Sequence, residues 1–207
     1  MRKQNYMVRT GRVPWIFMVL VIGSMLAGCS PRTKYERTLA RELASGVRHD
    51  SLFMGIYLGM SDKDFYTHCW ELNHEGLIKQ GATNTSVEYQ IKDELEHPAT
   101  MNFYPVFEDG RIVEMTVRFS YNGWAPWNKE LCPENLAIDI RHWYEQLYGK
   151  GFITVEHSEH GKAFVKVDGN RRITIFNEPD LSAWAIFTDM TAERQMKDTL
   201  SGAPGLP

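Results

Sequence analysis

Residues 101–119 read MNFYPVFEDGRIVEMTVRF, and they carry a strong hairpin pattern from which the rest of the fold can be built outward. Apolar side chains alternate with other residues on both sides of Asp109-Gly110, which is the period of a β-strand with one buried face. The Asp-Gly pair accepts the positive φ angles that a tight hairpin turn requires. The stretch therefore predicts two antiparallel strands joined at residues 108–111. Their shared apolar face is expected to comprise Met101, Phe103, Pro105, Val113, Met115, Val117 and Phe119.

One helix is predicted before this hairpin and another after it. Residues 61–64 are Ser-Asp-Lys-Asp, a typical helix start, because Ser accepts backbone N–H bonds and acidic side chains suit the positive helix end. The apolar face of this helix would comprise Phe65, Cys69 and Leu72. Pro133 suits the first turn of the second helix, where its missing N–H costs nothing. The apolar face of that helix would comprise Leu136, Ile140, Trp143 or Tyr144, and Leu147.

The remaining strand patterns complete an α+β fold of two tandem units, each a helix followed by an antiparallel meander, with the helices packed on the sheet. Alternation or β-rich composition marks strands at residues 87–91, 152–155, 163–167, 172–176 and 184–187. The expected units are residues 51–121 and 133–190. Leu72-x-x-x-Gly76-Leu77-Ile78 matches Leu147-x-x-x-Gly151-Phe152-Ile153 at the ends of the two helices, which favours an internal duplication. The alternative is that helix–Gly–strand junctions look alike for local reasons.

Leu26-Ala27-Gly28-Cys29 closes an apolar run that starts at Val13 and follows four basic residues with no acidic one. This order is that of a secretory signal peptide, and the run is shorter than the roughly 20 residues of a membrane-spanning helix. The cysteine after small residues resembles the bacterial lipoprotein signal, whose thiol receives diacylglycerol before cleavage. The sequence thus predicts a signal peptide over residues 1–28 and lipidation at Cys29. An ordinary signal peptide or an uncut signal anchor is the alternative.

The mature chain would then comprise a lipidated tether at 29–50, an α+β domain at 51–190 and a flexible tail at 191–207. Tyr35, Leu39 and Leu43 recur every four residues, so the tether could include a short helix. Ser30, rather than Asp, after the cysteine favours the outer membrane, with the protein facing the periplasm. Loss of residues 1–28 takes the net charge from −3 to −7, which argues against a nucleic-acid partner. No basic amphipathic face is expected either, so the acyl chains on Cys29 are expected to be the sole contact with membrane lipid.

The sequence contains no motif that points to catalysis, so neither an enzymatic activity nor a cofactor is expected. His157 and His160 lie three apart at the end of a predicted strand and would point to opposite faces, so no metal site is expected. Cys69 and Cys132 are the other cysteines, and the compartment beyond the inner membrane permits disulfides. A bridge between them and two separate buried thiols both remain open.

Residues 59–65, Gly-Met-Ser-Asp-Lys-Asp-Phe, resemble the Gly-Met-Thr/Ser helix start of the small outer-membrane assembly lipoproteins, the SmpA/OmlA or BamE-like family. The position after a lipidated tether is also similar. The resemblance implies a fold like that of the β-lactamase inhibitor protein, with helices followed by an antiparallel meander, sometimes in tandem. It also implies a role in assembly at the outer membrane. The chain departs from that family in being longer and in carrying a Trp-rich insert.

That insert, Tyr121-Asn122-Gly123-Trp124-Ala125-Pro126-Trp127, lies between the two units, where Gly and Pro oppose regular structure. Buried, Trp124 and Trp127 would fill the seam between the units. Exposed, Tyr121, Trp124 and Trp127 would anchor a protein or glycan partner, because Trp and Tyr dominate binding hot spots. The sequence favours a non-enzymatic envelope lipoprotein that acts as an interaction or assembly module. The alternative is a periplasmic binder of a small ligand or glycan that uses the same aromatic residues.

Overall fold

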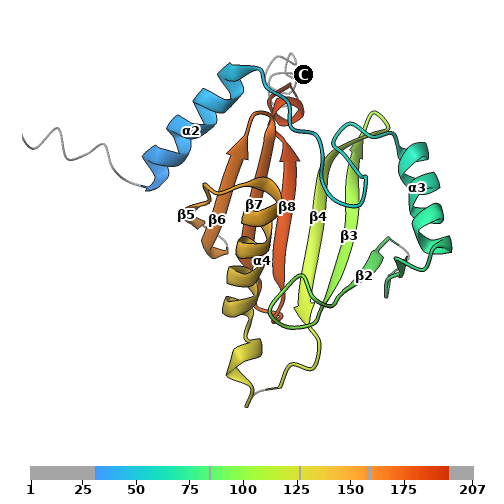
Figure 1. The fold of residues 1–207 in the computed structure, drawn as a ribbon. Helices are drawn as coiled ribbons and strands as arrows, with labels where there is room; N and C mark the ends of the chain where they lie inside the picture. Colours follow the sequence, from blue (N-terminus) through green and yellow to red (C-terminus); the bar gives the residue numbers. More distant parts are fainter. Residues whose placement is uncertain (1–30, 84, 126, 158–159, 196–207) are drawn as a thin grey trace, which may run out of the picture.

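The computed structural model describes residues 31–83, 85–125, 127–157 and 160–195, so the predicted lipidation site Cys29 lies outside the described residues. The described chain forms one eight-stranded antiparallel sheet in the order β1-β2-β3-β4-β8-β7-β6-β5 (Figure 1). The helices are α2 (Pro31–Ser45), α3 (Asp62–His74), the 3-10 helix η2 (Lys129–Leu131) and α4 (Pro133–Tyr148). The strands are β1 (Lys79–Gln80), β2 (Val87–Ile91), β3 (Ala99–Glu108), β4 (Arg111–Tyr121), β5 (Ile153–His157), β6 (Gly161–Asp168), β7 (Arg171–Asn177) and β8 (Ala183–Asp189).

The predicted α+β class with an antiparallel sheet is confirmed. The long central strands β4 and β8 pair with each other, so that Met115 lies opposite Phe187 and Val117 lies opposite Ala185. Two strand groups that are separate in sequence therefore share one continuous sheet. The sheet twists strongly and α4 crosses one of its faces (Figure 1).

The β3–β4 hairpin forms at the predicted turn, where Asp109 and Gly110 have φ angles of 47° and 69°. One expectation for this hairpin is wrong. Val106 pairs with Glu114 and Phe107 pairs with Ile112, so Val113 is the extra residue of a β-bulge. The bulge shifts the alternation by one position. Ile112 is therefore buried and Val113 is only half-buried, although Met115, Val117 and Phe119 face the core as predicted.

Both predicted helices start where the sequence indicates. At α3, the Ser61 hydroxyl accepts the backbone N–H of Asp64 at 3.1 Å, and Asp64 in turn accepts from the same hydroxyl at 2.7 Å. At α4, Pro133 occupies the first turn. The buried residues of α4 are Leu136, Ala137, Ile140 and Tyr144. Leu147 was predicted to join them, but it is 52% exposed, and Tyr148 contacts the sheet in its place, with its ring 5.6 Å from that of Phe187.

The core lies between one face of the sheet and a cover formed by α4 and the loop of residues 51–60. Tyr144 of α4 packs on Phe119 and Phe187, with ring centroids 6.3 and 5.4 Å apart. Phe53 from the loop inserts beside them, with its ring 5.0 Å from that of Phe103. Aromatic edge-to-face contacts of this kind stabilise the packing beyond the area they bury. The loop and α4 are thus held on the same apolar face.

Segment 29–50 was predicted to be a tether in which a short helix could form, and its described part is largely helical. Helix α2 contacts β5 and β6 and lies beside that edge of the sheet (Figure 1). Its half-buried positions include Tyr35, Leu39 and Leu43, which recur every four residues and therefore share one side of the helix. The described residues from Pro31 onward are docked on the domain rather than extended away from it. Residues 190–195 are also helical, and the rest of the predicted tail lies outside the described residues.

Candidate functional site

The connector between β4 and η2 carries the aromatic residues that the sequence singled out. Trp127 is 85% exposed and Trp124 is 41% exposed, so the seam interpretation of these two side chains is wrong. No space remains between the two units for these two rings, because β4 pairs directly with β8 and other side chains already fill the core beside this pair. Only Tyr121 of the three predicted residues is buried. Two large rings of the connector are therefore exposed to solvent. The connector follows β4 and runs along the lower end of the molecule in Figure 1.

The base of the connector is held firmly at the end of β4. The Tyr121 hydroxyl donates to the Asp139 carboxylate of α4. Burial, and secondly this hydrogen bond, raises the pKa of Tyr121, so the hydroxyl remains the donor at neutral pH. Asn122 is held on the sheet by its backbone N–H to the Pro98 carbonyl at 2.9 Å and by the Thr100 hydroxyl at 2.7 Å. These hydrogen bonds hold the first residues of the connector, Tyr121 and Asn122, against the sheet and α4.

The exit of the connector is fixed as well. The Asn128 side chain accepts the backbone N–H of Glu130 at 3.2 Å and so caps η2. The Asn135 side chain donates to the Glu130 carbonyl at 3.1 Å, which joins η2 to the first turn of α4. Hydrogen bonds therefore hold both ends of the connector in place. Preorganisation of this kind lowers the entropy cost of binding a partner.

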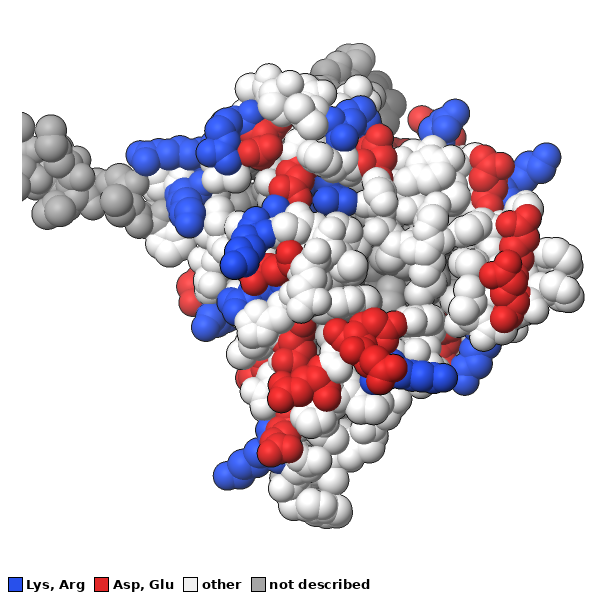
Figure 2. All heavy atoms as spheres, in the orientation of Figure 1, with Lys and Arg blue, Asp and Glu red and all other residues white. Residues whose placement is uncertain are grey.

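A cleft of about 370 Å³ lies beside the connector base, between α4 and the β2–β3 loop. Its charged and titratable lining comprises Glu96, His97, Glu130, Asp139 and His142. Acidic side chains gather on this part of the molecule, at the lower centre of Figure 2. His97 packs edge-on against Tyr121 with 5.8 Å between ring centroids. The cleft and the exposed rings of the connector together form a surface, termed here the acidic connector surface, that combines apolar anchors with negative charge.

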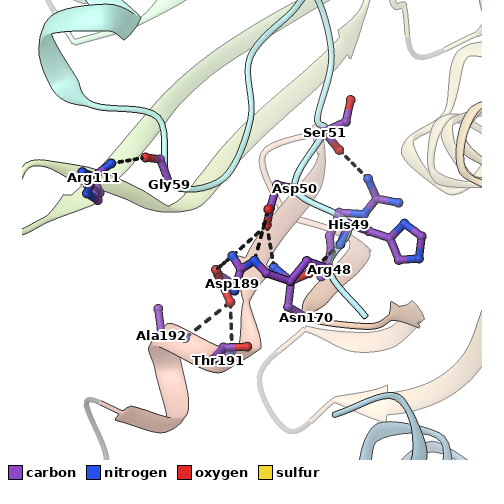
Figure 3. A network of polar contacts seen from close by, with 11 residues as sticks. Arg48, His49, Asp50, Ser51, Gly59, Arg111, Asn170, Asp189, Thr191 and Ala192 are labelled. Carbon is purple, nitrogen blue, oxygen red and sulfur yellow. Dashed lines mark hydrogen bonds and ion pairs between the residues drawn. The ribbon is translucent and has the colours of Figure 1, made fainter. Parts of the chain in front are cut away.

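A second polar cluster fixes the chain between α2 and the domain (Figure 3). Arg48 donates through Nη2 to Asp50 at 2.8 Å and to Asp189 at 2.9 Å. The His49 backbone N–H donates to the Asn170 side chain at 2.7 Å, and that same side chain donates to Asp50 at 2.9 Å. Residues 48–50 are therefore clamped onto the β6–β7 turn and the end of β8.

Arg171 extends this clamp into the interior. Its Nη1 donates to the Ser51 carbonyl, its Nη2 lies 3.4 Å from Asp168, and its guanidinium carbon lies 4.6 Å from the centre of the Tyr148 ring. A buried guanidinium is costly unless it is paired and hydrogen-bonded, and here both terminal nitrogens have partners whereas Nε is buried without one among the described residues. The clamp gives the polypeptide that leads toward Cys29 a defined exit from the domain.

The two remaining cysteines are both free thiols, so the disulfide alternative is not realised. Cys69 lies on α3 near Tyr104, whereas Cys132 precedes α4 and lies near Tyr121. The two cysteines are therefore near well-separated positions of the sheet. Tyr104 pairs with Thr116 of β4, and Thr116 is five residues from Tyr121, or about 16 Å at the usual strand rise. Burial raises the pKa of the Cys69 thiol to about 11, so it stays protonated and unreactive at neutral pH.

The predicted β5–β6 tip carries His157 and His160. His160 pairs with Glu178 at 2.8 Å and stacks on Phe176 at 4.0 Å, and the side chain of His157 lies outside the described residues. Within the described part of the chain, no group of three or more His, Cys, Asp or Glu side chains is placed to hold a metal ion. Among the described helices, none has the length and apolar character needed to cross a bilayer.

The sequence analysis missed an aromatic groove beneath α3. The groove has a volume of about 310 Å³ and is lined by Tyr66, Trp70, Val87 and Tyr104 among others. The Tyr66 and Tyr104 hydroxyls are 2.7 Å apart, and Trp70, which is 68% exposed, stacks on His74. Tyr66 and Trp70 are four residues apart, which is a helical spacing that could have indicated a second, outward aromatic face on this helix.

No family model matches the chain, and neither a curated protein nor a solved structure was found to be similar to it.

Proposed function

We propose that this protein is a lipid-anchored, non-enzymatic interaction module of the cell envelope, held at the outer membrane through Cys29 and facing the periplasm. The observation that carries the proposal is Trp127, an indole ring 85% exposed on a connector whose two ends are hydrogen-bonded in place. Trp124, three residues away, is 41% exposed, and exposed Trp rings of this kind supply the anchors of many binding surfaces. The acidic connector surface is therefore the proposed docking site.

The chemistry of that surface indicates the kind of partner. Trp124 and Trp127 would supply the apolar anchors, since Trp is enriched among the residues that dominate binding energy. Glu96, Glu130 and Asp139 line the adjacent cleft and would attract a basic segment. We infer that the partner is an envelope protein that offers an apolar side chain flanked by Lys or Arg. An assembly role, as implied by the resemblance of residues 59–65 to the BamE-like lipoproteins, is part of this proposal.

Capture in living cells tests the proposal. A photo-crosslinking amino acid at Lys129, which is exposed beside Trp127, should capture one or a few envelope proteins in the otherwise unchanged chain. Trp127→Ala combined with Trp124→Ala should abolish this capture while leaving the melting temperature nearly unchanged, because both rings lie largely outside the core. Trp70→Ala is the matched control, since it removes an exposed indole from α3 and should leave capture intact.

Two outcomes of this experiment would contradict the proposal. The first is capture that persists at full strength in the Trp124/Trp127 double variant. The second is equal loss of capture in the Trp70 variant, which would move the binding surface to the groove beneath α3. The anchor is tested separately: Cys29→Ala should block incorporation of a fatty-acid analogue, and equal labelling of that variant would refute lipidation at Cys29.

Binding of a small ligand or glycan is the second candidate function. The supporting observation is the cleft of about 370 Å³, whose carboxylates and imidazoles provide acceptors and donors for hydroxyl groups next to the exposed rings. In that case purified protein should bind soluble oligosaccharides with quenching of Trp fluorescence, and Trp127→Ala should remove the signal. A protein partner predicts capture without such quenching.

We also propose that the two halves of the domain arose by duplication. In support, each half runs helix then four strands, and the strand order is symmetric about the β4–β8 pair. Gly76 and Gly151, the matched positions after the two helices, both have positive φ angles, and Ile78 and Ile153, two residues further on, are both buried. The matched leucines differ, because Leu72 is buried and Leu147 is exposed.

A further inference from the structure

Helix α2 has two chemically distinct sides. The side toward the sheet carries the half-buried residues Tyr35, Leu39 and Leu43, and Glu42 on the same side accepts the backbone N–H of Gly169 at 3.3 Å. The other side is exposed and carries Lys34, Arg37 and Arg41. At the helical pitch of about 100° per residue, these three positions lie within about 60° of one another. They form a basic stripe that faces away from the domain.

Acidic side chains neutralise only part of the positive charge of the stripe. Arg41 pairs with Glu42 at 2.9 Å, but Lys34 and Arg37 form no ion pair with another described residue. The other acidic residue of the helix, Glu36, pairs with Arg32 at 3.2 Å and lies outside the stripe. Lys and Arg side chains gather over α2 at the left of Figure 2, whereas the mature chain as a whole would be acidic.

The stripe also lies close to the proposed lipid anchor. Helix α2 begins at Pro31, two residues after Cys29. Two residues of extended chain span at most about 7 Å, so acyl chains on Cys29 would hold the first turn of α2 near the headgroups. Because α2 is docked on β5 and β6, the direction of the helix would also set the orientation of the whole domain. A membrane contact by this side of the helix would add to the one expected from the acyl chains.

We propose that the stripe of Lys34, Arg37 and Arg41 binds the phosphate groups of anionic phospholipids and lays α2 along the membrane surface. The inference rests on the proposed anchoring at Cys29 and specifies how the anchored domain is oriented. A lipid chain combined with basic residues is a recognised pair of membrane-binding signals. Each basic residue at an anionic surface contributes about a fivefold gain in binding. The acidic connector surface, repelled by the same lipids, would remain available to a partner.

Amine labelling of the acylated, full mature protein on vesicles tests the inference. Lys34 should react with an N-hydroxysuccinimide ester at least about fivefold more slowly on vesicles that contain phosphatidylglycerol than on pure phosphatidylcholine vesicles. Salt at about 0.5 M should remove the difference, because the Debye length is then only a few ångströms. Lys63 and Lys129 are exposed on other elements and serve as internal controls with no expected change.

Charge variants make the test specific. Arg37→Gln with Arg41→Gln keeps Lys34 as the reporter and should remove most of its protection on anionic vesicles. Lys63→Gln with Lys129→Gln, which removes the same charge elsewhere, should leave the protection unchanged. Equal labelling of Lys34 on both kinds of vesicle, in protein whose acylation is verified by mass spectrometry, would overturn the inference while leaving the anchor intact. Unacylated protein from the wild-type gene would refute the anchor instead, and protection of Lys34 in that sample would still support the stripe.

Discussion

The guanidinium of Arg48 lies 2.9 Å from the carboxylate of Asp189, although 141 residues separate them in the chain. Asp189 also accepts the backbone N–H of Thr191 at 2.9 Å, so one carboxylate joins the segment after α2 to the end of β8 and to the start of the helical residues 190–195. Because this segment leads toward Cys29, the pair determines how rigidly the domain is held relative to the predicted anchor.

Asp189→Ala should therefore destabilise the folded protein by about 2 kcal/mol, since its side chain is only 8% exposed and its partners include a charged group. Urea unfolding gives the free energy, and hydrogen exchange should show faster exchange of the His49 amide. Arg32→Ala, which removes an exposed pair on α2, is the control and should cost less than about 0.5 kcal/mol. An unchanged exchange rate at His49 would show that the pair does not hold this segment.

Gly169 tests the same junction from the side of the β6–β7 turn. Its φ angle is +53°, and a Cβ atom there would lie 2.2 Å from the Val47 carbonyl oxygen. Gly169→Ala should cost about 1–3 kcal/mol more than Gly110→Ala, because the backbone of the N-terminal segment must move aside. Gly110 has a φ angle of +69°, but its nearest neighbour is the Asp62 carboxylate at 3.9 Å. Equal losses of stability in the two variants would mean that the positive φ angle alone accounts for the cost and that the close approach to Val47 adds nothing to it.

Local sequence patterns predicted most individual elements but not their arrangement. Alternation and turn chemistry located the β3–β4 hairpin, and capping chemistry located the start of α3. The pairing of β4 with β8 brings residues 114–119 against residues 183–188, and nothing in either local pattern encodes this contact. The bulge at Val113 was missed for the same reason, because it depends on the register with Val106 and Phe107.

The candidate site was predicted only in part. Composition singled out Trp124 and Trp127, but whether a ring is buried or exposed depends on which surfaces are already filled, and the β4–β8 pairing left no seam. The clamp of Arg48 with Asp189 joins distant residues that are unremarkable in sequence. By contrast, the spacing of Lys34, Arg37 and Arg41 is visible in the sequence and required only a helical interpretation of residues 31–45.

Two tyrosines of α4, one turn apart, should respond oppositely to loss of their hydroxyl groups. In the described structure the Tyr144 hydroxyl is buried without a hydrogen-bond partner, whereas the Tyr148 hydroxyl donates to the Leu52 carbonyl at 2.9 Å. Tyr144→Phe should therefore leave stability unchanged or raise it by about 1 kcal/mol, because an unsatisfied buried hydroxyl is costly. Tyr148→Phe should lower stability by about 1 kcal/mol. Calorimetric melting of both variants checks the pair, and destabilisation by Tyr144→Phe would indicate a partner for its hydroxyl.

Glu114 should make stability fall as the pH rises from acid toward neutral. Burial raises the pKa of its carboxyl, an effect opposed by the hydrogen bond from Thr188 and by the charge of Arg172, and increased by Glu193. The folded state therefore holds this proton more tightly than the unfolded state. The resulting stabilisation is complete below the unfolded pKa of about 4.3 and is lost as the pH rises through the folded value.

Glu114→Gln keeps the size of the side chain and an acceptor for Thr188 but cannot ionise. The variant should be at least as stable as the wild type at pH 7, with the advantage disappearing as the pH falls below about 4. Urea unfolding of both proteins between about pH 3.5 and about pH 7 measures the difference. Glu36→Gln, at an exposed position of α2, should show no such trend. A stability difference between Glu114→Gln and wild type that stays constant with pH would contradict a raised pKa at Glu114.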